Sequence, residues 1–172
     1  MLEKICKCLS MQCRFGGDVR RFYSVAEHTV HMVNQAQEDG VSRNIRLAMW
    51  LHDSPEYLTG DLLPPVKTNP IIAAEYSRIE GRVMQAICHR LDVSPDMGAI
   101  ALGSEIVKKY DQAILAAEAQ TVAGPQPNWD PFDETDRLHV AFDKRIQSVE
   151  WLGADFHYWQ NAMMAQFEEL TQ

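Results

Sequence analysis

The sequence lacks any apolar run approaching the ~20 residues that a membrane-spanning helix requires. Residues 1–8 also lack the apolar stretch of a secretory signal, so we expect a cytoplasmic protein with no membrane partner. Cysteines are few, and in a reducing compartment Cys6, Cys8, Cys13 and Cys88 should remain thiols. They also lack the paired Cys-x2-Cys spacing of structural zinc sites, which argues against a thiol metal site.

Basic side chains are scarce relative to acidic ones. The chain has 16 Lys and Arg against 24 Asp and Glu, a formal charge of −8. Such a surface repels a phosphate backbone, which argues against binding to long nucleic acid. A small anionic substrate is compatible, because a local basic patch can override the net charge. Arg14, Arg20 and Arg21 lie close together in the sequence and could form such a patch.

No segment shows the alternation of a β-strand, and there is no internal repeat or low-complexity segment. The 172 residues suffice for one domain with a buried core. Hydrophobic residues make up 46% and charged residues 23%, as in ordinary globular proteins. We therefore predict an all-α fold and a single domain over residues 1–172.

Helix start and stop signals divide the chain. Ser24 and Glu27 have the spacing of a capping box, and Gly40 ends that helix. Pro55 predicts a kink or a restart, and Gly60 closes the segment. The predicted helices cover residues 1–12, 24–40, 42–53, 54–60, 69–90, 94–123 with a break near Gly103, a segment from about 136, and about 154–170. Irregular loops are predicted at 13–23, 61–67 and 124–135.

The predicted helix 42–53 is apolar nearly all round in its last two turns, so it should be buried. It ends at His52 and Asp53, where a loop rich in Gly, Asp and Pro follows. Adjacent helical residues point ~100° apart, so this pair is not a chelate by itself. If it binds a metal, other helices must supply the remaining ligands.

His28 and Asp111 are candidates for those ligands. His28 lies on an amphipathic helix and could equally be an ordinary half-buried histidine, as could His31. Asp111 is a carboxylate among apolar positions, so its burial requires a partner. A metal would serve, and so would a salt bridge with Lys108, Lys109 or an arginine.

Polar residues near these ligands could act on a substrate. Glu56 follows Asp53 by three positions and could act as a general base or acid, provided that Pro55 does not turn it away. Asp61 could accept hydrogen bonds from a hydroxylated substrate, or be an ordinary turn residue. Arg14 suits bidentate phosphate binding, and Lys67 is a weaker candidate for the same task.

Short segments of this chain occur in a specific order. They are residues 14–15 (RF), 24–29 (SVAEHT), 51–61 (LHDSPEYLTGD), 65–67 (PVK) and 110–111 (YD). This order resembles that of the HD-domain phosphohydrolases, in particular the bacterial 5′-deoxynucleotidases and phage deoxynucleotide triphosphohydrolases. The resemblance covers about residues 12–118, whereas the expected C-terminal helices, at about 136–170, show little of it.

The resemblance implies a helical bundle with a single divalent metal at its centre. The implied ligands are His28, His52, Asp53 and Asp111. Two nitrogen and two oxygen ligands suit Mn, Co, Fe, Ni or Zn, and Mg is compatible. Glu56 takes the catalytic acid/base role by this resemblance, and Asp61 contacts the sugar or orients water.

The implied activity is removal of the 5′ phosphate or polyphosphate from a deoxynucleotide. Arg14 would hold the phosphate, and the choice between mono- and triphosphate stays open. Two residues depart from the family pattern. Pro55 replaces a small residue, and Phe15 stands beside the expected sugar site where the deoxynucleotidases commonly carry tryptophan.

Other hypotheses are kept beside this one. The chain could be a non-catalytic nucleotide-binding regulatory domain, or a dinuclear iron protein with extra ligands such as His31 or His89. The residues after the His-Asp pair fit a cyclic-dinucleotide phosphodiesterase less well. The resemblance also implies a homo-oligomer. The tryptophans Trp129, Trp151 and Trp159 could be buried between chains or in the core.

Overall fold

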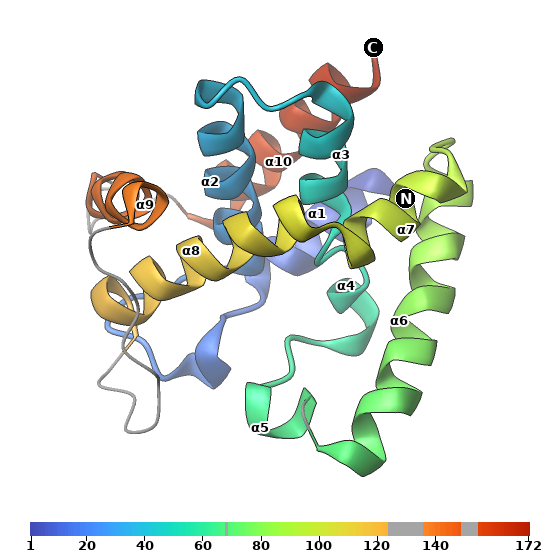
Figure 1. The fold of residues 1–172 in the computed structure, drawn as a ribbon, viewed down its shortest axis with the longest axis horizontal. Helices are drawn as coiled ribbons and strands as arrows, with labels where there is room; N and C mark the ends of the chain where they lie inside the picture. The colour runs from blue at the N-terminus through green and yellow to red at the C-terminus, as the bar shows by residue number, and fades with distance from the viewer. Residues whose placement is uncertain (68, 124–135, 149–154) are drawn as a thin grey trace.

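The structure, a computed structural model, describes residues 1–67, 69–123, 136–148 and 155–172 (Figure 1). Within these ranges every regular element is a helix, and extended residues pair only in isolated bridges. The all-α prediction is therefore confirmed. The elements are α1 (Leu2–Met11), η1 (Phe15–Gly17), α2 (Val25–Glu38), α3 (Arg43–Leu51), α4 (Glu56–Thr59), α5 (Pro64–Lys67), α6 (Pro70–Arg90), α7 (Pro95–Gly103), α8 (Glu105–Thr121), α9 (Arg137–Gln147) and α10 (Phe156–Thr171).

Local signals set most of the helix starts. The Ser24 hydroxyl accepts a hydrogen bond from the Glu27 N–H at 3.0 Å, which satisfies one of the unpaired donors at the start of α2. Asn69 and Ser94 cap α6 and α7 in the same way, each followed by proline in the first turn. The predicted break near Gly103 falls at Ser104, between α7 and α8.

One predicted loop is partly helical. Residues 61–67 were expected to be irregular, but Leu63 O accepts hydrogen bonds from Val66 N and Lys67 N at 2.9 and 3.1 Å, and this single turn is α5. The first turn of a helix tolerates two adjacent prolines, because the fixed φ of proline suits a helix and the first N–H groups have no partner within it. The predicted loop at 124–135 lies outside the described residues.

Helix α2 lies at the middle of the bundle and packs against α1, α3, α8, α9 and α10 (Figure 1). Nearly all of its positions from Val25 to Ala36 are buried. The apolar end of α3 is buried as predicted, and the Trp50 indole donates a hydrogen bond to Met163 O on α10 at 2.9 Å. The core therefore surrounds α2, which carries His28, and α3, which is followed directly by His52 and Asp53.

Helix α6 lies to one side, where its main contacts are with α4, α5 and α7 (Figure 1). In the C-terminal part, Trp159 is 4% exposed with its ring 5.2 Å from that of His31, so it belongs to the core. Trp129 and Trp151 lie outside the described residues. All four cysteines are free thiols. Among the described helices, none has both the length and the apolar character needed to cross a bilayer.

Candidate metal centre

The loop between α1 and α2 closes on itself and thereby positions Arg14. Arg14 N donates to Tyr23 O at 2.9 Å, and Val25 N donates to Gln12 O at 3.1 Å. Both ends of the loop are thus tied together at the first turn of α2. The Arg14 side chain is consequently buried, with 7% of the residue exposed, beside the polar residues of the core.

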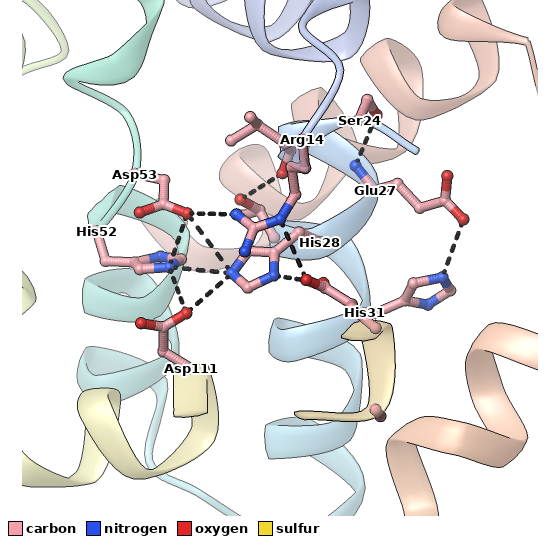
Figure 2. A network of polar contacts seen from close by, with 12 residues as sticks. Arg14, Ser24, Glu27, His28, His31, His52, Asp53 and Asp111 are labelled. Carbon is pink, nitrogen blue, oxygen red and sulfur yellow. Dashed lines mark hydrogen bonds and ion pairs between the residues drawn. The ribbon is translucent and has the colours of Figure 1, made fainter. Parts of the chain in front are cut away.

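The predicted metal ligands come from three elements and converge. His28 projects from α2, His52 and Asp53 directly follow α3, and Asp111 lies in α8, with the four side chains directed at one another in Figure 2. His28 Nε2 lies 3.3 Å from His52 Nε2, 3.5 Å from Asp53 Oδ2 and 3.3 Å from Asp111 Oδ1. His52 Nε2 lies 3.1 Å from Asp53 Oδ2 and 3.8 Å from Asp111 Oδ1.

Hydrogen bonds on the far side of each imidazole fix its tautomer. His52 Nδ1 lies 2.6 Å from Met49 O, and a carbonyl can only accept, so Nδ1 carries the proton. His28 Nδ1 lies 2.6 Å from the Glu118 carboxylate and donates to it for the same reason. Both Nε2 atoms, which lie 3.3 Å apart, are therefore the ring nitrogens available to coordinate a cation, which would take the place of any proton there.

This donor set fits a divalent cation. Metal bonds of about 2.1 Å separate neighbouring ligands by about 3.0 to 3.4 Å in octahedral or tetrahedral geometry, close to the observed range. Two imidazole lone pairs and two carboxylates would otherwise repel one another in a buried site. His28, His52 and Asp53 are the one such group among the described residues, with donor atoms within 4.8 Å of one another. Asp111 lies beside this group, with its Oδ1 3.3 Å from His28 Nε2 and 3.8 Å from His52 Nε2.

The pKa values of these groups express the same balance of charge. Burial lowers the pKa of His52, but the negative charges of Asp53 and Asp111 outweigh it and hold that pKa well above its usual range. Burial raises the pKa of Asp111, yet hydrogen bonds from His28 and His52 hold it well below its usual range. The cluster therefore favours positive charge at its centre, as a proton or as a metal ion.

A cleft of about 200 Å³ opens beside these ligands. Four acidic side chains (Asp53, Glu56, Asp61 and Asp111) and two basic ones (Arg14 and Lys67) line it together with the apolar Phe15, Leu62, Leu63 and Leu115. All the predicted substrate-contacting and catalytic residues therefore face one space. Its acidic excess would repel an anionic substrate unless a cation were bound there.

Glu56 is 2% exposed at the wall of this cleft. Its Oε1 accepts a 2.8 Å hydrogen bond from Lys67 Nζ, whereas its Oε2 has no hydrogen-bond partner among the described residues. Burial and the nearby Asp53 charge raise the pKa of Glu56 to about 8, although Lys67 opposes the shift. A carboxyl group that is protonated near neutral pH can donate a proton. The restart of the helix after Pro55 keeps Glu56 on the side of the ligands.

Asp61 and Phe15 both line the cleft. Asp61 directly follows Gly60, which ends α4 at φ +78°. Burial raises the pKa of Asp61, against the lowering effect of Arg14 and Lys67. Phe15 adopts φ +58°, and its ring lies 5.8 Å from the Arg14 guanidinium carbon. Gly16, which follows Phe15, faces the side chain of Leu63, the residue before α5. The Phe15 turn and Leu63 therefore line the same part of the cleft.

The prediction that Arg14, Arg20 and Arg21 form one basic patch is wrong for Arg20 and Arg21. Arg21 forms a double ion pair with Glu27 at 2.7 and 3.0 Å, and Arg20 donates to Gln120 O at 3.3 Å. Neither lines the cleft, because the loop turns them away after Gly17. Lys67 joins Arg14 there instead. Glu27, which follows the cap of α2, is occupied by Arg21 and does not contact His28.

Neither histidine considered for a dinuclear site belongs to the metal-donor group found among the described residues. His31 Nε2 lies 3.6 Å from Glu27, and the ring of His31 packs between Tyr23 and Trp159. His89 is exposed in the last turn of α6. Within the described ranges, one mononuclear site is the arrangement that the geometry supports.

Glu118 was not predicted from the sequence. It is fully buried in α8, two turns after Asp111, and contacts both His28 and Arg14. A signal for it did exist. Like Asp111, Glu118 is a carboxylate in an apolar helical segment, after Ala116 and Ala117, and such a group needs a buried partner.

Comparisons with known proteins give partial relatives. No protein-family model matches the chain. An uncharacterized protein of Rhodobacter capsulatus is 31% identical over 127 residues, covering 72% of this chain and 63% of the relative. The uncharacterized protein YfdR of Escherichia coli is 30% identical over 118 residues, 69% of this chain and 58% of the relative. A 5′-deoxynucleotidase of Photobacterium profundum is 32% identical over 93 residues, 51% of this chain and 47% of the relative. The chain thus spans about half to three fifths of the length of these relatives.

Proposed function

We propose that the protein is a metal-dependent phosphohydrolase of the HD-domain type that removes the 5′ phosphate from a deoxynucleoside monophosphate. The observation that carries this proposal is the convergence of His28 and His52 with two carboxylates, Asp53 and Asp111, that line the same cleft as Arg14, Lys67 and Glu56. The partial relative named 5′-deoxynucleotidase supports the same class of activity.

His28, His52, Asp53 and Asp111 would hold the cation. When bound, a divalent cation supplies Lewis-acid polarisation of a phosphoryl oxygen and of water. Asp111, with 38% of its side chain exposed, and Asp53, with 17%, are the ligands nearest solvent, whereas His28 is fully buried. Substrate would therefore approach from the side of the two carboxylates, which also line the cleft.

The surrounding residues would bind the phosphate and move the proton. Arg14 and Lys67 neutralise charge on the phosphoryl oxygens. Water attacks phosphorus, the bond from phosphorus to O5′ breaks, and the neutral Glu56 carboxyl donates its proton to the leaving oxygen. The phosphate product keeps one proton of the water, and the other is released and restores the Glu56 carboxyl. Asp61 accepts a hydrogen bond from the sugar or the water. The apolar wall formed by Phe15, Leu62, Leu63 and Leu115 packs against the deoxyribose and base.

The number of basic side chains in the cleft favours a monophosphate over a triphosphate as the substrate. With Arg20 and Arg21 directed elsewhere, Arg14 and Lys67 are the basic residues of the cleft, enough for one anion site. A volume of about 200 Å³ lies below the ~300 Å³ at the lower end of whole-ligand pockets. The chain of a triphosphate would have to extend into solvent.

The test is product release from a panel of ribo- and deoxynucleotides, mono- and triphosphates side by side. The protein is first treated with chelator and then assayed with Mn, Co, Mg, Zn or no metal. Orthophosphate from deoxynucleoside monophosphates supports the proposal. Tripolyphosphate or pyrophosphate from triphosphates would replace it with a triphosphohydrolase. Nucleotide binding without release under any condition would make the domain a regulatory one.

A further inference from the structure

Glu118 joins the candidate metal centre to the phosphate-binding arginine. Its Oε1 accepts from His28 Nδ1 at 2.6 Å, and its Oε2 accepts from Arg14 Nε at 3.1 Å. Both carboxylate oxygens are thus engaged, and no part of the residue is exposed. Asp111 and Glu118 are seven positions apart, so the same face of α8 supplies a metal ligand and this carboxylate.

The two contacts have different consequences. At His28, acceptance of the Nδ1 proton leaves Nε2 unprotonated and directed toward the other ligands, and it also fixes the rotation of the ring. At Arg14, use of the inner Nε–H leaves the two terminal nitrogens of the guanidinium toward the cleft, where one of them lies 3.5 Å from Asp53 Oδ2.

From this geometry we infer that Glu118 is a positioning residue that orients a metal ligand and the substrate-binding arginine together. A single carboxylate then sets the distance between the cation and the guanidinium that must share one phosphate group. Misplacement of either group by a fraction of an ångström would weaken the other's contact with the same substrate. The inference rests on the proposed function for the roles of His28 as a metal ligand and of Arg14 as the phosphate-binding residue.

A purely structural role, in which Glu118 only neutralises buried Arg14, makes different predictions. The chain offers a matched control in Glu27, which is 1% exposed, forms an ion pair with Arg21 and lies 3.6 Å from His31 of the same helix α2. The ion pairs of the Glu27 side chain are with Arg21 and His31, which lie outside the cluster. Replacing either glutamate by glutamine removes a buried negative charge next to an arginine and a histidine, so both variants should lose stability.

The experiment compares Glu118→Gln with Glu27→Gln in chelator-treated full-length protein. Isothermal titration with Co²⁺ alone measures metal affinity, and steady-state kinetics with a deoxynucleoside monophosphate measures KM and kcat. In Glu118→Gln one of the two acceptor oxygens is replaced by an NH2 group. The side chain can then no longer accept one hydrogen bond from His28 Nδ1 and one from Arg14 Nε as the carboxylate does. We expect its Co²⁺ dissociation constant to rise about 10- to 100-fold and its KM to rise about tenfold, with Glu27→Gln within about twofold of wild type.

A measurement on the wild-type protein covers the case in which Glu118→Gln does not fold. Long-range ¹H–¹⁵N correlation spectra of the Zn²⁺-loaded protein report the imidazole tautomers, and the His28 proton is expected on Nδ1. A proton on His28 Nε2 would overturn the inference. So would Co²⁺ affinity in Glu118→Gln within about twofold of wild type, or an equal loss of affinity in Glu27→Gln.

Failure here is distinguishable from failure of the proposed function. If wild type hydrolyses no nucleotide but Glu118→Gln alone loses Co²⁺ affinity, the positioning of His28 stands and the proposed activity falls. If wild type hydrolyses deoxynucleotides and Glu118→Gln keeps its Co²⁺ affinity, the activity stands and the positioning role falls.

Discussion

Helix α2 carries two buried histidines, His28 and His31, one turn apart. Each lies near a buried glutamate that pairs with an arginine, but their other neighbours differ. His28 contacts Glu118, which also pairs with Arg14, and His31 lies near Glu27, which also pairs with Arg21. His28 Nε2 faces three further metal-donor side chains, His52 and Asp53 after the end of α3 and Asp111 in α8. His31 instead lies between the rings of Tyr23 and Trp159, and its Nε2 has no hydrogen-bond partner among the described residues.

The comparison shows that residue type and burial do not by themselves place a histidine beside other metal-donor side chains. Both histidines are almost fully buried, at 0% and 4% exposed. What separates them is the set of elements that meets each face of α2. The face of α2 that carries His28 is next to Asp53, which follows α3, and Asp111, which lies in α8. The face that carries His31 is next to the aromatic rings of Tyr23 and Trp159.

The largest expected effect is on the His28 side of the comparison. Asp111→Ala should abolish metal-dependent phosphate release and weaken Co²⁺ binding by more than about 100-fold, because it removes a direct ligand rather than a supporting partner. Asp111 is partly exposed, so the fold should survive. Titration calorimetry and phosphate release measure both effects. Asp96→Ala, at an exposed first turn of α7, is the control, and full activity in Asp111→Ala would remove the metal site from the mechanism.

Glu56→Gln should lower kcat by about 10²- to 10⁴-fold with little change in Co²⁺ affinity, because Glu56 moves a proton and is not a ligand. Since burial and Asp53 raise the pKa of Glu56 to about 8, the protonated, active form is lost as pH rises through that value. Wild-type kcat should therefore fall on the alkaline side. The positive charge of a bound cation lowers this pKa, so the midpoint should lie at or below about pH 8. A pH profile of kcat with no alkaline fall would contradict the assignment.

Lys67→Ala should raise KM for a monophosphate about 10- to 100-fold, the loss of one charge-assisted contact of about 1.5 to 3 kcal/mol. The alkaline limb of kcat should also move to higher pH, because Lys67 lowers the pKa of Glu56. Lys67 is one-third exposed on its side chain, so stability should change little. Lys108→Ala, at an exposed ion pair on α8, is the control. An unchanged KM would exclude Lys67 from substrate binding.

The smallest catalytic effect is expected on the other histidine. His31→Ala should reduce the free energy of unfolding by about 1 to 3 kcal/mol through lost packing against Trp159 and Tyr23. Co²⁺ affinity and kcat/KM should remain within about twofold of wild type. Urea unfolding and the phosphate assay test the two halves separately. Loss of metal affinity in His31→Ala would break the distinction between the two faces of α2.

Most helix boundaries were predictable because local chemistry fixes them. Ser24, Asn69 and Ser94 accept hydrogen bonds from the first N–H groups of their helices, and Gly60 ends one with positive φ. The short helix α5 was missed, because its single turn depends on the backbone of Leu63 and not on a periodic pattern. The predicted candidates for the site do lie together, but their roles stay predictions until they are tested.

The sequence by itself determined an all-helical chain and the residue types available for metal and phosphate chemistry, because caps, prolines and apolar periodicity act over a few residues. Only the tertiary structure decided which of those residues meet. It placed His28 but not His31 beside Asp53, turned Arg20 and Arg21 away from the cleft, and brought Glu118 to His28 across 90 positions of sequence. Such contacts depend on how whole helices pack, and no local signal specifies them.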